Sequence, residues 1–446
     1  MKTTALRGRI VGFRDDPFLQ PPSSCLQYEP DGLVLIRDGL IASVGPFAEL
    51  APTLPQGTPI HDYGDAIISA GFVDAHVHFP QFGVIAAPGE QLLEWLERYV
   101  FPAEARFADE THAERVAGLF LRELLRNGTT TACVYCSVHP QSVDAFFRES
   151  ERFNTRMIAG KVLMDRNAPP ALRDTARTGH DDSLALIRRW HGRGRQSYAV
   201  TPRFAASCTP EQLEAAGDLL QRADGLFVQT HLSENLAEIE WVKQLFPDSA
   251  SYLDVYDRYG LVGERTVLGH GIHLAEQDFC CCHRKGAALA HCPTSNRFLG
   301  SGAFRLFDAR DGRRPVHVAL GTDVGAGTSL SQLATLGEAY KTAQAVGRGT
   351  LGAIQGFWLA TLGGARALQL DDRIGRVAPG FEADLVVLDP GATDLLRFRT
   401  EQGGDIEDTL FALMTIGDDR AVRATWVAGE CVYDRDRAEP FAPVTD

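Results

Sequence analysis

The feature that most constrains the fold of this chain is an alternation of short apolar runs with longer helical patterns. It extends through the middle of the sequence, where helical patterns at 113–125, 210–223 and 276–284 precede strand-like runs at 129–134, 226–231 and 287–291. Alternation over roughly 300 residues indicates repeated βα units, and a closed (β/α)₈ barrel takes about 250 residues plus insertions. We therefore expect an α/β fold of the TIM-like barrel type, with its chemistry at the rim where the strands end.

Both ends of the chain have a different pattern. Residues 33–45 form β-like runs around Asp38-Gly39, a hairpin signal, and residues 383–389 and 424–433 have the same character. We expect the two ends to pair into one small β-sandwich outside the barrel. The predicted domains are 1–68 (first part of the sandwich), 69–372 (barrel) and 373–446 (second part of the sandwich).

Composition and charge exclude several classes of protein. The chain has 446 residues and a formal net charge of −14, and an acidic surface repels the phosphates of nucleic acid. We find neither the apolar run of a signal peptide nor the ~18 apolar residues of a membrane span, so we expect a cytoplasmic protein with no membrane or nucleic-acid partner. Nine cysteines, three of them at Cys280–Cys282, do not resemble a disulfide framework.

A candidate metal site begins at the end of the strand-like run 66–78, which finishes in His76-Val77-His78. Side chains two residues apart on a strand lie on the same face, so both imidazoles can converge on one cation. The alternative is a polar strand end with two ordinary histidines, although two buried imidazoles without partners would be costly.

Three further strand-like runs end in residues that suit the same site. The run 226–231 ends in His231, with Glu234 three positions later, which would supply a ligand and a separate proton carrier. The run 265–270 ends in His270, and the run 316–323 ends in Asp323. Taken singly, Glu234 or Asp323 is better explained as a helix cap.

The ordered set is stronger than its members, because a barrel brings all four strand ends to one rim. Three neutral imidazoles and one carboxylate suit a divalent transition metal with one position left for water. The pattern does not separate zinc from iron or manganese.

At these residues the chain resembles the amidohydrolase superfamily and, within it, the guanine deaminases. The resemblance runs from about residue 30 to the C-terminus. The histidine and aspartate pattern is shared across the superfamily, whereas Pro80-Gln81 and Arg203-Phe204 resemble the purine-reading residues of guanine deaminases. Ala70 stands where the family more often has proline, and Phe79 fills a variable position. The matching stretches are 71–81, 202–209, 229–235, 269–274, 290–296 and 321–325.

The resemblance implies a zinc enzyme, with one metal ion per chain, that converts guanine and water to xanthine and ammonia. It also implies a homodimer. Glu234 would be the proton shuttle, with His270 and Asp323 acting beside it on the attacking water. The implied metal ligands are His76, His78, His231 and Asp323, and the implied substrate-binding residues are Gln81 and Arg203 at the O6 and imidazole edges of the base, Phe204 against its ring, and His231, Glu234 and His270.

Three alternatives remain open from the sequence. The first is another ring aminohydrolase or chlorohydrolase, acting on a triazine, an adenosine-like compound or another purine. The second is a catalytically silent barrel that serves as a scaffold. The third is a cysteine-based redox or metal-storage protein, for which the Cys133–Cys136 spacing and the Cys280–Cys282 cluster are the only signals, and both are better explained as packed elements of the fold.

Overall fold

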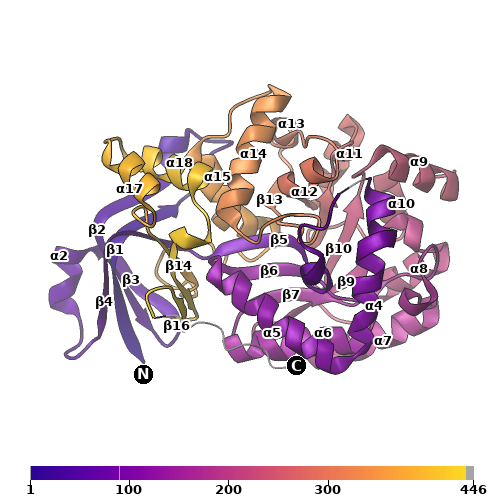
Figure 1. Ribbon diagram of the computed structural model, residues 1–446, viewed down its shortest axis with the longest axis horizontal. Coiled ribbons are helices and arrows are strands. Elements are labelled where there is room, and N and C mark those ends of the chain that lie inside the picture. Colours follow the sequence, from indigo (N-terminus) through magenta and orange to yellow (C-terminus); the bar gives the residue numbers. More distant parts are fainter. Residues whose placement is uncertain (1, 90, 438–446) are drawn as a thin grey trace.

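The computed structural model describes residues 2–89 and 91–437. Within them the chain forms a barrel of parallel strands and a separate sheet built from both ends of the chain (Figure 1). The predicted barrel and the predicted pairing of both termini into one β-domain are therefore confirmed, and the domain that we expected as a sandwich is built on a single seven-stranded sheet. The predicted domain boundaries stay predictions.

The barrel consists of eight parallel strands that follow one another in chain order around the sheet. It closes through backbone hydrogen bonds, because the amide of Asp323 donates to the carbonyl of His76 (2.8 Å) and the amide of His78 donates to the carbonyl of Val324 (2.9 Å). A short extra strand, β8 (Val162–Leu163), pairs with β9. The eight strands are β5 (Phe72–His78), β6 (Thr129–Tyr135), β7 (Arg156–Gly160), β9 (Ser197–Pro202), β10 (Phe227–Leu232), β11 (Thr266–His270), β12 (Ala288–His291) and β13 (His317–Leu320).

Helices follow the barrel strands and pack their apolar faces against the outside of the barrel (Figure 1). The first long helix shows why. Asp109 caps it by accepting a hydrogen bond from the amide of His112 (3.2 Å), and Ala113, Ala117 and Phe120 recur along its buried face at helical spacing. The helices of this part are α5 (Glu110–Arg126), α6 (Pro140–Phe153), α7 (Ala176–Trp190), α8 (Pro210–Leu219), α9 (Leu236–Leu245), α10 (Tyr252–Arg258), α11 (Glu276–Lys285), α12 (Pro293–Phe298), α13 (Leu306–Ala309), α14 (Gln332–Val346), α15 (Ala353–Trp358) and α16 (Gly364–Ala367).

The interior of the barrel is lined by small and medium side chains, among them Val73, Cys133, Ala199 and Ala290. One interior position requires glycine for a steric reason. A Cβ atom on Gly269 would lie 2.6 Å from Cε1 of His76, so the missing side chain leaves the room that the imidazole occupies.

A stretch of short helices lies between β5 and α5 in the sequence. It begins with α3 (Leu92–Trp95), continues as a π-helical turn at Leu96–Val100 and ends with α4 (Phe101–Ala105). This stretch, 92–105, contributes several side chains to the pocket described below.

The terminal sheet has seven strands in the order β16-β15-β14-β4-β1-β2-β3. Strand β4 is central, since it pairs in parallel with β1 and antiparallel with β14, which joins the two ends of the chain. One residue, Gly71, separates β4 from the first barrel strand. The strands are β1 (Thr3–Phe13), β2 (Leu26–Arg37), β3 (Leu40–Pro46), β4 (Ile60–Ala70), β14 (Leu385–Leu388), β15 (Val422–Val427) and β16 (Glu430–Asp434), and helix α2 (Phe47–Leu50) packs beside β2 and β3. Of the other helices from the two ends of the chain, α1 (Pro22–Cys25) contacts α15, and α18 (Ile406–Ile416) packs against α14, α15 and α17 (Asp394–Glu401).

A buried ion cluster ties this sheet to the barrel. Arg156, on β7, donates from Nε to Oε2 of Glu382 (2.8 Å), and the guanidinium of Arg195 pairs with both Glu382 and Asp384. The two acidic residues lie just before β14, so the contact joins the two parts of the fold.

The described residues contain no helix that is long and apolar enough to cross a membrane. All nine cysteines are free, and Cys280 and Cys281 are half-buried on α11 while Cys282 is buried. None of them belongs to a group of potential metal ligands within the described part of the chain.

Candidate active site

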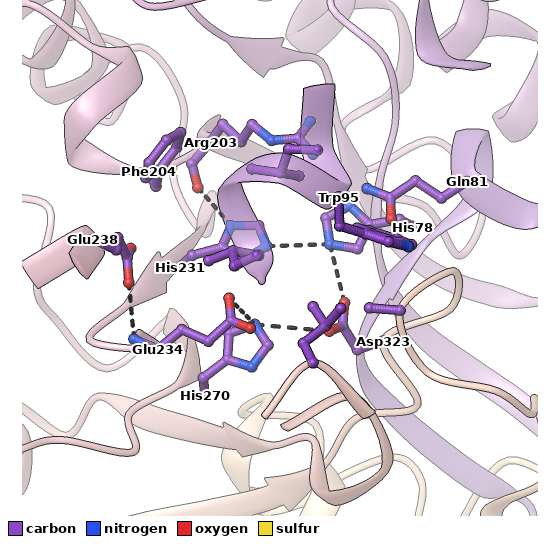
Figure 2. Close-up of a pocket in the computed structure, with 14 residues that line it drawn as sticks. His78, Gln81, Trp95, Arg203, Phe204, His231, Glu234, Glu238, His270 and Asp323 are labelled. Atoms are coloured by element: carbon purple, nitrogen blue, oxygen red, sulfur yellow. Dashed lines mark hydrogen bonds and ion pairs between the residues drawn. The ribbon is translucent and has the colours of Figure 1, made fainter. Parts of the chain in front are cut away.

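The four predicted strand ends meet in one pocket (Figure 2). His78 comes from β5, His231 from β10 and His270 from β11, while Asp323 follows β13. The pocket is lined by His78, Gln81, Leu92, Trp95, Leu96, Arg203, Phe204, His231, Glu234, Glu238, His270, Leu299, Asp323 and Ala326. All predicted site residues are therefore brought together, with His76 buried directly beside the lining.

Three imidazoles and one carboxylate converge at the bottom of the pocket. Nε2 of His78 lies 3.2 Å from Nε2 of His76 and 3.2 Å from Nε2 of His231. Oδ1 of Asp323 lies 3.3 Å from Nε2 of both His76 and His78. These atoms belong to groups whose members all lie within 4.8 Å of one another.

The imidazoles are neutral, because burial lowers the pKa of His76, of His78 (to about 4) and, well below its usual value, of His231. For His231 the tautomer is also fixed. Its Nδ1 lies 2.6 Å from the carbonyl oxygen of Arg203, which can only accept, so Nδ1 carries the proton and Nε2 keeps its lone pair.

This donor set fits a divalent metal ion. Nε2 of His231 offers a lone pair and lies 3.2 Å from Nε2 of His78, which in turn lies 3.2 Å from Nε2 of His76, and a cation at their centre would satisfy all three nitrogens together with the carboxylate. The nitrogen-rich set suits zinc and other first-row transition metals better than magnesium or calcium, which prefer oxygen ligands.

Glu234 lies at the edge of this cluster with its carboxyl group in the pocket (Figure 2). Oε1 accepts a hydrogen bond from Oγ of Ser301 (3.0 Å), and Oε2 lies 3.4 Å from Nε2 of His270. Burial, reinforced by the nearby charge of Asp323, raises the pKa of Glu234 to about 8. A carboxyl group that holds its proton near neutral pH can act as a proton donor as well as an acceptor.

His270 lies between the two carboxyl groups of the site. Its Nε2 is 3.4 Å from Oε2 of Glu234 and 3.8 Å from Oδ2 of Asp323, while Nδ1 donates to Oδ1 of Asn296 (2.8 Å). Asn296 thus orients the ring so that Nε2 faces the pocket.

The opposite wall of the pocket carries Arg203, Phe204 and Gln81. The guanidinium of Arg203 is 3% exposed and donates from NH1 to both carboxylate oxygens of Glu104, at 2.8 and 2.7 Å. Gln81 donates from Nε2 to Oε1 of the same carboxylate (3.0 Å). The ring of Phe204 is buried in the wall and contacts Trp241 edge-on, with 6.0 Å between ring centroids.

Three residues near the site were not predicted from the sequence. Trp95 lines the pocket, and its indole N–H has no hydrogen-bond partner among the residues described. Glu238 accepts hydrogen bonds from the amides of Glu234 (3.0 Å) and Asn235 (3.2 Å) and so fixes the turn that carries Glu234. Glu104 is the third, and it lies behind the lining rather than in it.

Three residues at the site also have a strained backbone. Ser233, His270 and Asp323 have φ angles of 47°, 69° and 49°, in the left-handed region that non-glycine residues rarely adopt. Each such residue costs about 1–3 kcal/mol and persists only where its surroundings hold it. Asp74 helps to hold the backbone just before Asp323, because its carboxylate accepts a hydrogen bond from the amide of Thr322 (3.0 Å).

Comparison with known proteins agrees with this geometry. The Amidohydrolase family model matches residues 67–432. Guanine deaminase of Escherichia coli K12 is 47% identical over 435 residues, which cover 97% of this chain and 98% of the relative.

Solved structures are similar over nearly the whole length. A guanine deaminase from C. acetobutylicum, with guanine bound in its active site, has a TM-score of 0.86 at 28% identity and covers 97% of this chain and 100% of its own. An adenosine deaminase from Xanthomonas campestris, with zinc bound, has a TM-score of 0.82 at 25% identity and covers 96% and 92%. The chain therefore belongs to the amidohydrolase family and, within it, to the guanine deaminases.

Proposed function

We infer that this enzyme hydrolyses the exocyclic amine of guanine and releases xanthine and ammonia. The observation that carries the inference is the arrangement of the pocket, where a proton-holding Glu234 and a histidine–aspartate cluster face the donors of Gln81 and Arg203. The 47% identity to a guanine deaminase over nearly the full chain supports the same substrate.

We propose zinc as the cofactor, one ion per chain, held by His76, His78, His231 and Asp323. The neutral imidazoles and their converging Nε2 atoms support this ligand set, and the related adenosine deaminase has zinc bound. A divalent ion in this position would lower the pKa of a water molecule in the pocket.

Glu234 would move the protons of the reaction. As the water oxygen bonds to C2 of guanine, the first water proton would pass to the His270–Asp323 pair while Glu234 delivers its own proton to ring N3, and the tetrahedral carbon carries both the new hydroxyl and the old amine. Glu234, now ionised, then takes up the hydroxyl proton and passes it to the amine, whose bond to C2 breaks so that ammonia leaves. The proton held by the His270–Asp323 pair returns to Glu234 and restores the starting state. His270 and Asp323 would hold the attacking water, since their side chains flank the same space.

Arg203 and Gln81 would select the base. Guanine presents a carbonyl oxygen at O6, which accepts from a guanidinium, whereas adenine presents an amine at that position. A donor facing a buried donor costs about 1–3 kcal/mol or more, which is enough to discriminate between the bases. Phe204 would pack against the ring.

The test is incubation with guanine while xanthine and ammonia are followed, with and without a chelator. Parallel assays with adenine, cytosine and triazines separate guanine from the other ring substrates. Absence of turnover with every base would favour a scaffold role. A metal content near one per chain that is unchanged by Cys→Ser substitutions would exclude the cysteine-based alternative.

We also propose that the enzyme is a cytoplasmic homodimer, as the family resemblance and the composition of the chain suggest. Size-exclusion chromatography with light scattering tests the assembly, and cell fractionation tests the location. A monomer in solution, or enzyme recovered outside the cytoplasm, would contradict the corresponding part of this proposal.

A further inference from the structure

We propose that Glu104 is a positioning residue for base recognition, and that it makes the pocket selective for a neutral base rather than an anion. The inference rests on the proposed function, since it concerns how Gln81 and Arg203 read the substrate. Glu104 itself does not line the pocket, so it acts through these two side chains.

The carboxylate of Glu104 is almost fully enclosed. It lies on α4, is 1% exposed, and has both oxygens engaged by its neighbours. Oε1 accepts from Gln81 Nε2 at 3.0 Å and from Arg203 NH1 at 2.8 Å, while Oε2 accepts from the same Arg203 nitrogen at 2.7 Å. One buried carboxylate therefore connects Gln81 and Arg203, and we call these two residues the recognition wall.

The first consequence concerns the amide of Gln81. An ionised carboxylate can only accept hydrogen bonds, so the NH₂ end of the amide must face Glu104. The other end is also occupied, since Oε1 of Gln81 lies 3.4 Å from the donating amide of Gly325. The amide is thus held in one of its two orientations, and the pattern of donor and acceptor that it presents to a base is fixed before the base arrives.

The second consequence concerns charge. Arg203 is a buried cation, and Glu104 is the carboxylate with which it pairs. While the pair is intact, the recognition wall offers directed N–H donors without a net charge. Without the carboxylate, the same wall would carry an uncompensated cation, which favours anionic ligands.

The product of the proposed reaction provides the probe for this charge effect. Xanthine has a second ring carbonyl in place of the amine of guanine, so it loses a ring proton more readily. A positively charged wall would hold its anion more tightly, and the enzyme would be inhibited by its own product. Glu104 would therefore serve product release as well as substrate recognition.

The experiment compares Glu104→Gln with the wild-type holoenzyme. We expect the KM for guanine to rise by at least about tenfold with kcat changed less than about threefold, because the residue affects binding of the ground state and the transition state alike. We expect inhibition by xanthine to become stronger, most clearly above neutral pH, and metal content to stay unchanged. Ser137→Ala is the matched control: it removes a hydrogen bond to the backbone carbonyl of Glu104 (3.0 Å) and leaves the carboxylate in place, so its KM should equal that of the wild type.

A double-mutant cycle with Gln81→Ala separates positioning from general damage. If Glu104 acts through Gln81, the KM effect of Glu104→Gln shrinks in the Gln81→Ala background. If Glu104→Gln does not fold, Glu104→Asp tests the positioning role instead. It keeps the charge but is one methylene too short for both contacts, so KM should rise while inhibition by xanthine stays at the wild-type level.

Unchanged KM and unchanged xanthine inhibition in Glu104→Gln, or in Glu104→Asp where only that variant folds, would overturn this role. The role would also be overturned if Glu104→Gln raised KM by the same factor in the wild-type and Gln81→Ala backgrounds. Failure of the wild-type enzyme to convert guanine would instead overturn the proposed function, so the two outcomes are distinguishable.

Discussion

Replacing Glu234 by glutamine should separate catalysis from stability in this enzyme. The substitution keeps the size of the side chain and leaves the backbone contact from Glu234 to Glu238 intact, but an amide cannot exchange a proton with substrate. General acid–base catalysis contributes about 10²–10⁴ in rate, so kcat should fall by that factor, or about 3–5 kcal/mol. KM should change little, because ground-state contacts remain.

The same substitution should stabilise the metal-free chain at alkaline pH. Burial raises the pKa of Glu234 from 4.5 to about 8, so between these values the folded state keeps a proton that the unfolded state has lost. Stability then falls as pH rises through this window. At 1.36 kcal/mol for each pH unit, the loss is on the order of 4 kcal/mol at pH 8, and Glu234→Gln does not suffer it.

Urea denaturation of both proteins after metal removal, at pH 5.5 and 8.5, measures the effect. The variant should be more stable than the wild type by about 1 kcal/mol at pH 5.5 and by about 4–5 kcal/mol at pH 8.5, so its advantage should grow by about 3 kcal/mol between the two pH values. Stopped assays of the metal-loaded proteins report kcat. A variant that is less stable than the wild type at pH 8.5, or that retains more than a tenth of the wild-type kcat, would refute the reasoning.

Three further predictions concern the metal, the recognition wall and the contact between the two parts of the fold. Chelation should abolish turnover, and one equivalent of zinc should restore it, as followed by ammonia release; activity that survives complete metal removal would contradict the site. Arg203→Ala should lose guanine turnover while keeping its metal. The variant should also unfold more easily, because Glu104 is left without its cation at a cost of about 3–5 kcal/mol. Metal analysis and thermal denaturation test the metal content and the stability, and wild-type activity in the variant would contradict the prediction. Burial alone would raise the pKa of Glu382, yet Arg156 and Arg195 hold that pKa below its usual range. The stability that the ionised Glu382 adds is therefore present above about pH 4.5 and is lost as pH falls through the lower pKa of the folded state. Glu382→Gln should flatten the fall in Tm on acidification, and equal slopes for variant and wild type would argue against this role.

The sequence predicted that the histidines and the aspartate would lie together because the signals were local. Each of the four strand-like runs ends in a titratable residue, and a parallel barrel places such ends at one rim whatever the details of register. His76 and His78 needed only the two-residue period of a strand to share a face. The barrel and the terminal sheet were predictable for the same reason, since hydrophobic period and hairpin signals can be read over a few residues.

What the sequence did not predict depends on contacts between distant segments. Glu104 lies on a short helix and reaches Arg203 across 99 positions of sequence, and a glutamate on a helix is ordinarily exposed. Its position after Phe101 and Pro102 gave one faint signal, a charge among apolar neighbours. Trp95 lines the pocket because the stretch 92–105, which is not a barrel strand, packs beside the residues at the strand ends. Backbone details such as the left-handed φ of His270 have no sequence signal when the residue is not glycine.

The central place of β4 in the terminal sheet has a consequence for how the protein is made on the ribosome. Its partner β14 is among the last parts to be synthesised, and β4 leads through a single glycine into the first barrel strand. Until translation reaches β14, one edge of β4 offers unpaired backbone groups next to a growing barrel. A nascent chain that stalls before residue 385 would therefore carry an open, aggregation-prone edge, which closes when β14 pairs with β4.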